Sequence, residues 1–181
     1  MLNTPVPKTM IPLNVTHKAI VTNPVYAKLM DPTAHDVPPE AASSQLRHTL
    51  STLIIVFKEK YESIFGFVDG PPLHDALTIA YVSKPELFTG KRYRVDVELT
   101  GVHSSGQTVA DVYGYQKVDD TWGRTGRNCE VATDLDVRTV RIPRFWLTDE
   151  SISQVAAFFR LFLECVARCD EVSPLNLNPA N

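Results

Sequence analysis

Hydrophobic residues recur at helical spacing in the two longest patterned segments of the chain. Between residues 41 and 65 the apolar side chains are three and four positions apart, so they share one face of a helix, which Gly66 would end. The other segment starts with the capping sequence Thr148–Glu150 and keeps an apolar face as far as Val166. The pattern therefore predicts two long amphipathic helices.

Two shorter helices are predicted between loops that contain several prolines. The first runs from Pro24 to Met30, because proline is favoured at the first helical position. The second covers residues 73–83 and is apolar on most sides, so we expect it to be buried. Residues 31–40 and 68–72 are predicted as the loops that precede the long helix and the second short one.

Short apolar or alternating runs predict the strands of the fold. They lie at residues 9–15, 92–100, 107–115, 129–135 and 137–142. Pro12 weakens the first of them, since proline avoids the interior of a sheet. Residues 101–106 have glycine at both ends and join the second run to the third, which predicts an antiparallel hairpin.

Composition and charge narrow the class of protein. The chain has 181 residues, of which 44% are hydrophobic and 22% charged, enough for one domain with a core of its own. The formal net charge is −3 and no block of basic residues is present, which argues against nucleic acid or an anionic membrane as a partner. The apolar run at residues 53–57 is too short to cross a bilayer, and residues 1–5 do not read as a signal peptide, so we expect a cytoplasmic protein.

Three cysteines occur, at Cys129, Cys165 and Cys169. An odd number without close pairing argues against a disulfide framework, and no cluster of cysteine and histidine has the spacing of a zinc site. We interpret all three as buried thiols in a reducing compartment.

The candidate chemistry lies in the sequence PPLHD at Pro71–Asp75, between two predicted helices. The prolines stiffen the chain, and the N-terminus of the following helix favours a carboxylate. His74 and Asp75 presented together can move a proton and hold a cation. Taken alone, however, Asp75 is most simply explained as the N-cap of the helix and His74 as a loop histidine with a satisfied hydrogen bond.

Several segments of the chain resemble segments of the inosine-uridine preferring nucleoside hydrolases and occur in the same order as in that family. The first one given below resembles the late active-site segment of the family. They are PPLHDA at residues 71–76, MIPLNVTH at 10–17, YRVDVE at 93–98, GQTVAD at 106–111, and Asn128 with VATDLD at 131–136. The resemblance implies an α/β fold, namely the C-terminal part of an open, mostly parallel sheet with flanking helices and an antiparallel hairpin. It implies a partial domain over residues 9–169, after an irregular start at 1–8 and before a disordered tail at 170–181.

The resemblance also implies a reaction, the hydrolysis of the N-glycosidic bond of purine or pyrimidine ribonucleosides with the help of calcium. Carried onto this chain, Asp75 would be a calcium ligand and His74 the general acid beside the leaving base. Tyr61 lies where a ring would stack on the base, although its helical spacing explains it equally as a core residue.

One part of the family pattern has no counterpart in these 181 residues. The aspartate-rich sequence D-T-D-P-G-x-D-D, which supplies the water-activating base and the other metal ligands, does not occur. One aspartate cannot satisfy a cation that takes six to eight oxygens. We therefore expect a nucleoside hydrolase domain that is incomplete and inactive when it is alone. We expect it to form a homo-oligomer or to act with a missing N-terminal half. Its helices should have uncovered apolar faces. The alternative is a non-catalytic truncated product or an interaction module.

Overall fold

The computed structural model describes residues 1–135 and 154–177. The domain expected over residues 9–169 contains two compact units. Unit 1 comprises residues 1–15 and the chain from Phe88 to the end of the last described strand, and unit 2 comprises residues 16–87 and 154–177. The strand predicted at 137–142 and the cap predicted at 148–150 lie outside the described residues. No described helix is both long enough and apolar enough to span a membrane.

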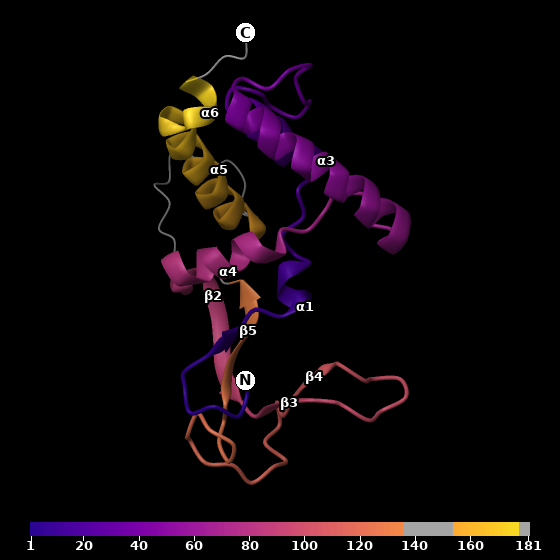
Figure 1. The fold of residues 1–181 in the computed structure, drawn as a ribbon, viewed down its shortest axis with the longest axis vertical. Helices are drawn as coiled ribbons and strands as arrows, with labels where there is room; N and C mark the ends of the chain where they lie inside the picture. Colours follow the sequence, from indigo (N-terminus) through magenta and orange to yellow (C-terminus); the bar gives the residue numbers. More distant parts are fainter. Residues whose placement is uncertain (136–153, 178–181) are drawn as a thin grey trace. The chain divides into compact units, whose positions relative to one another are not determined.

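Unit 1 is built on a three-stranded mixed sheet in the order β1-β5-β2 (Figure 1). The central strand β5 (Cys129–Leu135) pairs in parallel with β1 (Thr9–Met10) and antiparallel with β2 (Phe88–Tyr93). The bounds predicted for β5 are confirmed. The strand predicted at residues 9–15 is wrong beyond Met10, because Pro12 cannot donate to a ladder and helix α1 (Leu13–Thr16) follows.

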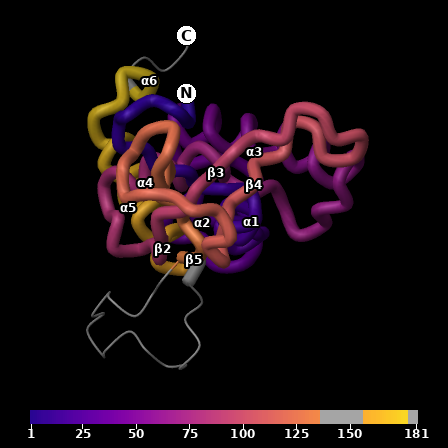
Figure 2. The backbone as a smooth tube through the Cα atoms, turned by 90° about the horizontal axis from the view of Figure 1, so that it is seen from below, coloured from indigo at the N-terminus to yellow at the C-terminus, as the bar shows by residue number. Residues whose placement is uncertain are grey.

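The predicted antiparallel hairpin is confirmed, although its strands are short. Strand β3 (Val95–Val97) pairs with β4 (Thr108–Ala110), and the connection between them extends away from the sheet (Figures 1 and 2). Strand β4 ends because the next residue, Asp111, accepts hydrogen bonds from the backbone N–H groups of Tyr115 and Gln116 at 2.9 and 2.7 Å. These bonds turn the chain in place of a continued ladder.

The core of unit 1 is small and contains one buried polar side chain. Val95, Cys129 and Val131 form its apolar centre. Asn128 is fully buried, and its amide oxygen accepts from the Val95 N–H at 2.8 Å while its nitrogen donates to the Val95 carbonyl at 2.9 Å. This reciprocal pair fixes the start of β3 beside the start of β5.

Unit 2 is helical. Its helices are α2 (Asn23–Met30), α3 (Gln45–Phe65), α4 (His74–Ser83), the 3-10 turn η1 (Pro85–Leu87), α5 (Gln154–Val172) and α6 (Pro174–Leu177). Proline in the first turn of α2 is confirmed. Helix α3 starts where Ser44 accepts from the Arg47 N–H at 3.2 Å and ends at Gly66, whose φ of 73° is the left-handed conformation of a helix stop.

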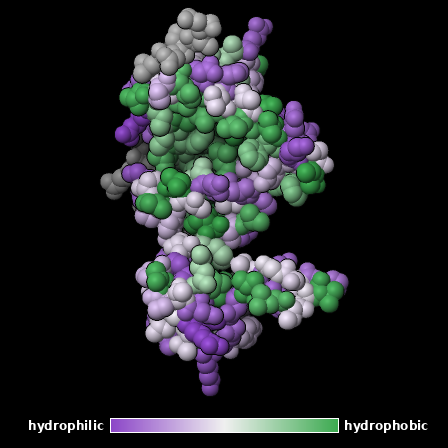
Figure 3. Space-filling model, viewed as in Figure 1, coloured by the Kyte–Doolittle hydropathy of each residue, from purple (hydrophilic) through white to green (hydrophobic). Residues whose placement is uncertain are grey.

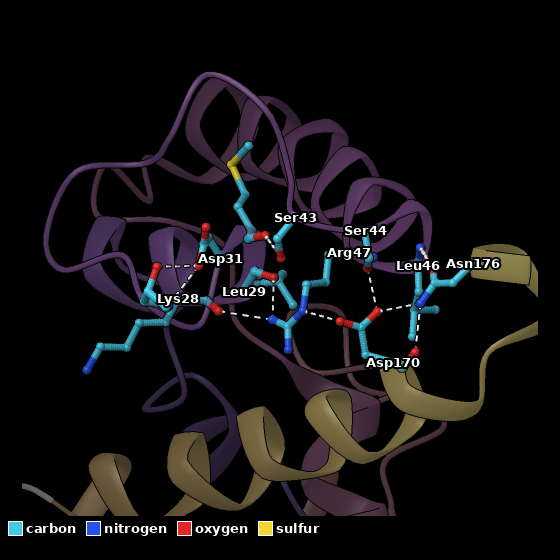
Figure 4. A network of polar contacts seen from close by, with 11 residues as sticks. Lys28, Leu29, Asp31, Ser43, Ser44, Leu46, Arg47, Asp170 and Asn176 are labelled. Carbon is cyan, nitrogen blue, oxygen red and sulfur yellow. Dashed lines mark hydrogen bonds and ion pairs between the residues drawn. The ribbon is translucent and has the colours of Figure 1, made fainter. Parts of the chain in front are cut away.

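A polar network joins the ends of four helices in unit 2 (Figure 4). Arg47 is only 2% exposed, and its Nε donates to Asp170 Oδ2 at 2.7 Å while its Nη1 donates to the carbonyls of Leu29 and Lys28 at 2.9 and 3.2 Å. Asp170 also accepts from Ser44 and from the Asn176 amide. Burial alone would raise the pKa of Asp170, but these hydrogen bonds and the charge of Arg47 hold that pKa below its usual value.

Three expectations about unit 2 need correction. Residues 170–177, predicted as a disordered tail, are helical in α5 and α6, because Asp170 and Asn176 belong to that network. Helix α4 buries only Leu77 and Ala80, while Ile79 and Val82 are 68% and 80% exposed. Of the three cysteines predicted to be buried, Cys165 and Cys169 are exposed, because both lie on the outer side of α5. Burial of the third, in unit 1, is confirmed.

The apolar face of α3 is covered only in part, as the sequence predicts. Leu50 and Ile54 are half-buried, but Leu53, Phe57 and Phe65 remain more than half exposed. Figure 3 shows hydrophobic side chains gathered over the region of α3 and α5. Apolar side chains of α3 are therefore left in contact with solvent in the described part of the chain.

Candidate active site

The loop before α4 is fixed to the chain by backbone hydrogen bonds. Val21 N–H donates to the Pro71 carbonyl at 2.9 Å, and Leu73 N–H donates to the Ala19 carbonyl at 3.0 Å. Gly70 has a φ of 135°, and a Cβ there would lie 2.1 Å from the Val21 carbonyl oxygen, so only glycine fits. These contacts set the residue at which α4 begins.

The beginning of α4 excludes one of the alternatives left open, the N-cap role of Asp75. The N-cap is Leu73 and not Asp75, and no side chain caps the helix. His74 is the first helical residue rather than a loop histidine, and Asp75 lies in the first turn. A carboxylate in that turn is stabilised by the helix dipole.

Both ring nitrogens of His74 make hydrogen bonds. Nδ1 lies 2.7 Å from Thr16 Oγ1, and Nε2 lies 2.8 Å from the Tyr61 hydroxyl. Thr16 is buried, and Tyr61 comes from α3, so α1, α3 and α4 together hold the imidazole. Since each hydroxyl can donate or accept, a proton taken up at one ring nitrogen can leave from the other.

Aromatic rings surround this hydrogen-bonded chain. The His17 ring centroid lies 5.4 Å from that of His74, and Phe67 lies 5.2 Å from His17 and 5.7 Å from Tyr61. Burial lowers the pKa of His74 below its ordinary value and the charge of His17 lowers it further, against the opposing effect of the Asp75 carboxylate. The site therefore favours the neutral imidazole, which can both accept and donate a proton.

Asp75 has a free carboxylate beside this group. The side chain is exposed and makes no hydrogen bond or ion pair within the part of the chain that the structure describes. Among those residues no three histidine, cysteine, aspartate or glutamate side chains form a group that could hold a metal ion. Asp75 can supply one oxygen ligand, but the described residues do not by themselves fit a calcium ion, which takes six to eight.

A cavity of about 340 Å³ opens beside His74 and Asp75. Its wall is mostly apolar, made by one face of α3 with Phe162 from α5, while Tyr61 and His74 bring polar atoms to its edge. An apolar cavity with a few convergent polar groups is the usual form of a small-molecule site. Tyr61, expected as a substrate-binding residue, thus lies both at the cavity and against His74.

Sequence reasoning did not single out Thr16 and His17 as site residues. Both belong to the NVTH run at residues 14–17, which was noted only as part of a resemblance. Thr16 lies 58 positions before His74 in the chain. The signal was a polar pair directly after a buried apolar residue, and its partner could be known only from the fold.

Comparisons with known proteins agree on one family. The family model described as inosine-uridine preferring nucleoside hydrolase matches residues 1–141. A probable ribonucleoside hydrolase of Dictyostelium discoideum is 32% identical over 137 residues, which cover 76% of this chain and 35% of that protein. A pyrimidine-specific ribonucleoside hydrolase of Shewanella woodyi is 36% identical over 110 residues, 60% of this chain and 32% of that one.

The fold is shared with a solved structure of the same kind. The purine-preferring ribonucleoside hydrolase from Gardnerella vaginalis superposes with a TM-score of 0.64 at 20% identity, over 93% of this chain and 42% of that one. At this identity the likeness bears on the fold alone. The chain spans about a third of the length of the two curated relatives described above.

Proposed function

The chain belongs to the inosine-uridine preferring nucleoside hydrolase family, and from that premise we propose that it is a domain of an N-ribohydrolase. The reaction is hydrolysis of the bond between ribose and the base of a ribonucleoside. The observation that carries the proposal is the hydrogen-bonded chain from Thr16 through His74 to Tyr61 at the edge of an apolar cavity. The names of relatives include pyrimidine-specific and purine-preferring enzymes, so the proposal covers ribonucleosides as a class.

In this proposal His74 is the general acid for the leaving base. Departure of the base leaves electron density on a ring nitrogen, and protonation there makes the base a better leaving group. Because both ring nitrogens are hydrogen-bonded, the proton passes from His74 through the Tyr61 hydroxyl, 2.8 Å from Nε2, which gives its own proton to the base and takes one from the imidazole. Because Thr16 bonds the other nitrogen, the imidazole cannot turn away from the cavity without losing both contacts.

Asp75 is proposed as one ligand of a calcium site. Its carboxylate has no partner among the described residues and lies in the first turn of α4, where negative charge is stabilised. A bound calcium ion would orient an attacking water and lower its pKa. The remaining ligands are not among the described residues, so the proposal assigns Asp75 a ligand role and no more.

We expect the 181-residue chain to be inactive when it is alone. It lacks the aspartate-rich sequence that the family uses to activate water, and the described residues hold no metal group. A homo-oligomer does not supply that sequence, so the missing carboxylates have to come from another polypeptide segment. We also place the protein in the cytoplasm, since its cysteines are free thiols and none forms a disulfide.

The test is a complementation assay for release of hypoxanthine from inosine and of uracil from uridine, with calcium present. The part of the Dictyostelium relative that lies outside its matched region is joined to this chain. We expect hydrolysis by the fusion and none by the chain alone. His74→Ala and Asp75→Asn in the fusion should each lower kcat by about 10²–10⁴-fold, the range for loss of a general acid or comparable group.

His48→Ala and Glu59→Gln serve as matched controls, since both side chains are exposed on α3. Both should leave turnover unchanged. A fusion that melts cooperatively but releases no base would overturn the proposed function. Turnover by the isolated chain that His74→Ala abolishes would support the activity and overturn the expectation that the chain is incomplete.

A second candidate is a non-catalytic interaction module. It is favoured by the apolar side chains of α3 that stay exposed, such as Phe57 and Phe65, and by the lack of a metal group in the described residues. In that case the apolar surface binds another protein segment and His74 has a structural role. Loss of partner binding in Phe57→Ser, with no nucleoside turnover in any fusion, would favour this candidate.

A further inference from the structure

Unit 1 contains a cavity of about 700 Å³ that the proposed function does not use. We call it the basic pocket. Its charged lining residues are Lys91, Arg92, Arg94, Lys117 and Arg127 on the positive side, and Asp111 and Asp119 on the negative side. It shares no residue with the cavity beside His74. Arg94 pairs with Asp96 outside the lining, so its charge is balanced, and the other four cations still outnumber the two lining carboxylates.

Two of the cations have charges that no carboxylate balances. Lys91 and Lys117 are exposed, and neither forms an ion pair within the described residues. The Lys91 ammonium lies 5.9 Å from the centre of the Tyr93 ring, a contact that steers the side chain without neutralising it. Arg127 pairs with Asp120 at 3.2 Å, but both side chains are at least half exposed, so this pair is weak.

The carboxylates of the basic pocket are occupied by the loop that carries them. Asp111 accepts from the N–H groups of Tyr115 and Gln116, and Asp119 accepts from Thr121 and Thr125. These hydrogen bonds keep the pKa of both carboxyl groups below the ordinary value. Their oxygens hold the shape of the pocket wall, and the lysines keep donors for a ligand.

Arg92 makes that wall rigid and keeps its charge. Its Nε and Nη2 donate to the carbonyls of Asp120, Thr121 and Arg127 at 2.8 to 3.2 Å, and its guanidinium lies 3.9 Å from the centre of the Trp122 ring. Carbonyl oxygens satisfy the hydrogen bonds of a guanidinium without cancelling its charge. The pocket is therefore preorganised before any anion arrives, which lowers the cost of binding.

We propose that the basic pocket binds the phosphate group of a small phosphorylated ligand. Lys91, Lys117 and Arg127 supply the donors, and Arg92 adds positive charge behind them. The lining also includes Tyr93 and Tyr113, on which a base can stack, so a nucleoside monophosphate fits the chemistry better than inorganic phosphate. The inference does not rest on the proposed activity, because it concerns other residues in the other unit.

The test measures binding of AMP, adenosine and inorganic phosphate to the 181-residue chain by isothermal titration calorimetry. We expect AMP to bind at least tenfold more tightly than adenosine, and more weakly as salt is raised, since exposed charges are screened. Lys91→Gln with Lys117→Gln should weaken AMP binding at least tenfold. Both side chains are exposed, so the double variant should keep the melting temperature of the parent chain.

Lys60→Gln is the matched control, an exposed lysine on α3 away from the basic pocket, and it should bind AMP as the parent does. Inorganic phosphate that binds as tightly as AMP would support the phosphate site and remove the role of the tyrosines. The proposal is overturned if AMP shows no saturable binding, if adenosine binds as tightly as AMP, or if the double lysine variant binds AMP unchanged.

Discussion

Arg47 in unit 2 and Arg92 in unit 1 use their charge in opposite ways. In unit 2 the buried guanidinium of Arg47 faces a carboxylate, Asp170, and the pair also satisfies backbone carbonyls. In unit 1, Arg94 also pairs with a carboxylate, Asp96, whereas Arg92 and Lys8 bind backbone carbonyls alone, Lys8 at 2.9 to 3.1 Å. The first arrangement cancels charge and fixes helices, whereas the second fixes loops and leaves positive charge for a ligand.

This difference has a consequence for stability and for function. A buried ion pair contributes little when intact, but breaking it is costly because one charge is left without a partner. A cation bound to carbonyls near the surface can lose its contacts at lower cost, since water replaces them. Unit 2 should thus be sensitive to loss of the Arg47 charge, and unit 1 should be sensitive mainly at Asn128, which is fully buried among its described residues.

The largest effect is expected from Arg47→Met, which keeps an unbranched apolar stem and removes the guanidinium charge. Asp170, 19% exposed, would lose its cation, and the Leu29 carbonyl would lose a donor. The free energy of unfolding should fall by about 3–5 kcal/mol. Urea denaturation followed by circular dichroism measures it. In the parent chain, the stability that goes with the lowered pKa of Asp170 is present above the ordinary aspartate range and is lost as the pH falls through that lowered pKa, and Arg47→Met should weaken this pH dependence.

Arg127→Met is the matched control, because Arg127 pairs with Asp120 at an exposed site in unit 1. It should cost about 0–1 kcal/mol. Adding Asp170→Asn to Arg47→Met should recover part of the loss, because the unpaired charge is then gone. Equal losses for Arg47→Met and Arg127→Met would remove the contrast between the units.

The next effect is expected from Asn128→Ala in unit 1. The substitution leaves the N–H and the carbonyl of Val95 buried without their partners at 2.8 and 2.9 Å. Each unpaired group costs about 1–3 kcal/mol, so the free energy of unfolding should fall by roughly that amount or somewhat more. Thermal denaturation of the full chain measures it. Asn3→Ala, whose side chain is exposed, is the control, and an equal loss there would contradict the role given to Asn128.

The hydrophobic pattern predicted most of the elements but not where polar side chains end them. Strand β5 has the predicted bounds because its side chains follow a local pattern that pairing on both sides preserves. Strand β4 is shorter than predicted because Asp111 captures two backbone N–H groups. A polar side chain that competes with strand pairing for backbone N–H groups cannot be recognised from the pattern of apolar positions.

The long-range polar contacts could not be predicted from the sequence. Arg47 lies on a helix predicted from its apolar face, and its partner Asp170 lies 123 positions away in a segment predicted to be disordered. The candidate site was partly visible, since His74 and Asp75 are adjacent in the chain. The two hydroxyls that hold the imidazole belong to other elements, so only the fold reveals them.

A smaller effect is expected from Tyr61→Phe, which removes the hydroxyl bonded to His74 and keeps the ring in its aromatic cluster. The loss of one hydrogen bond should cost about 0.5–1.5 kcal/mol. Chemical denaturation measures it, and the two-dimensional NMR signals of the His74 ring should shift. Tyr113→Phe, an exposed tyrosine in unit 1, should change neither stability nor those signals. If the Tyr61→Phe chain is as stable as the parent, the hydrogen bond between this hydroxyl and the imidazole does not stabilise the fold.

The smallest effect is the pH dependence that His74 gives to unit 2. Its pKa is lowered in the folded chain, chiefly by burial, so below the ordinary value of 6.5 the unfolded chain binds the proton more readily. The stability that the neutral imidazole contributes is therefore present above that pH and is lost as the pH falls through the lowered pKa. His74→Gln should flatten the dependence of the urea midpoint on pH between about 7.5 and about 5.5. His103→Gln, an exposed histidine in unit 1, should leave the dependence as it is. If both variants keep the slope of the parent chain, the titrating group lies elsewhere, and the contrast between a charge-sensitive helical unit and a tolerant strand unit rests on Arg47 alone.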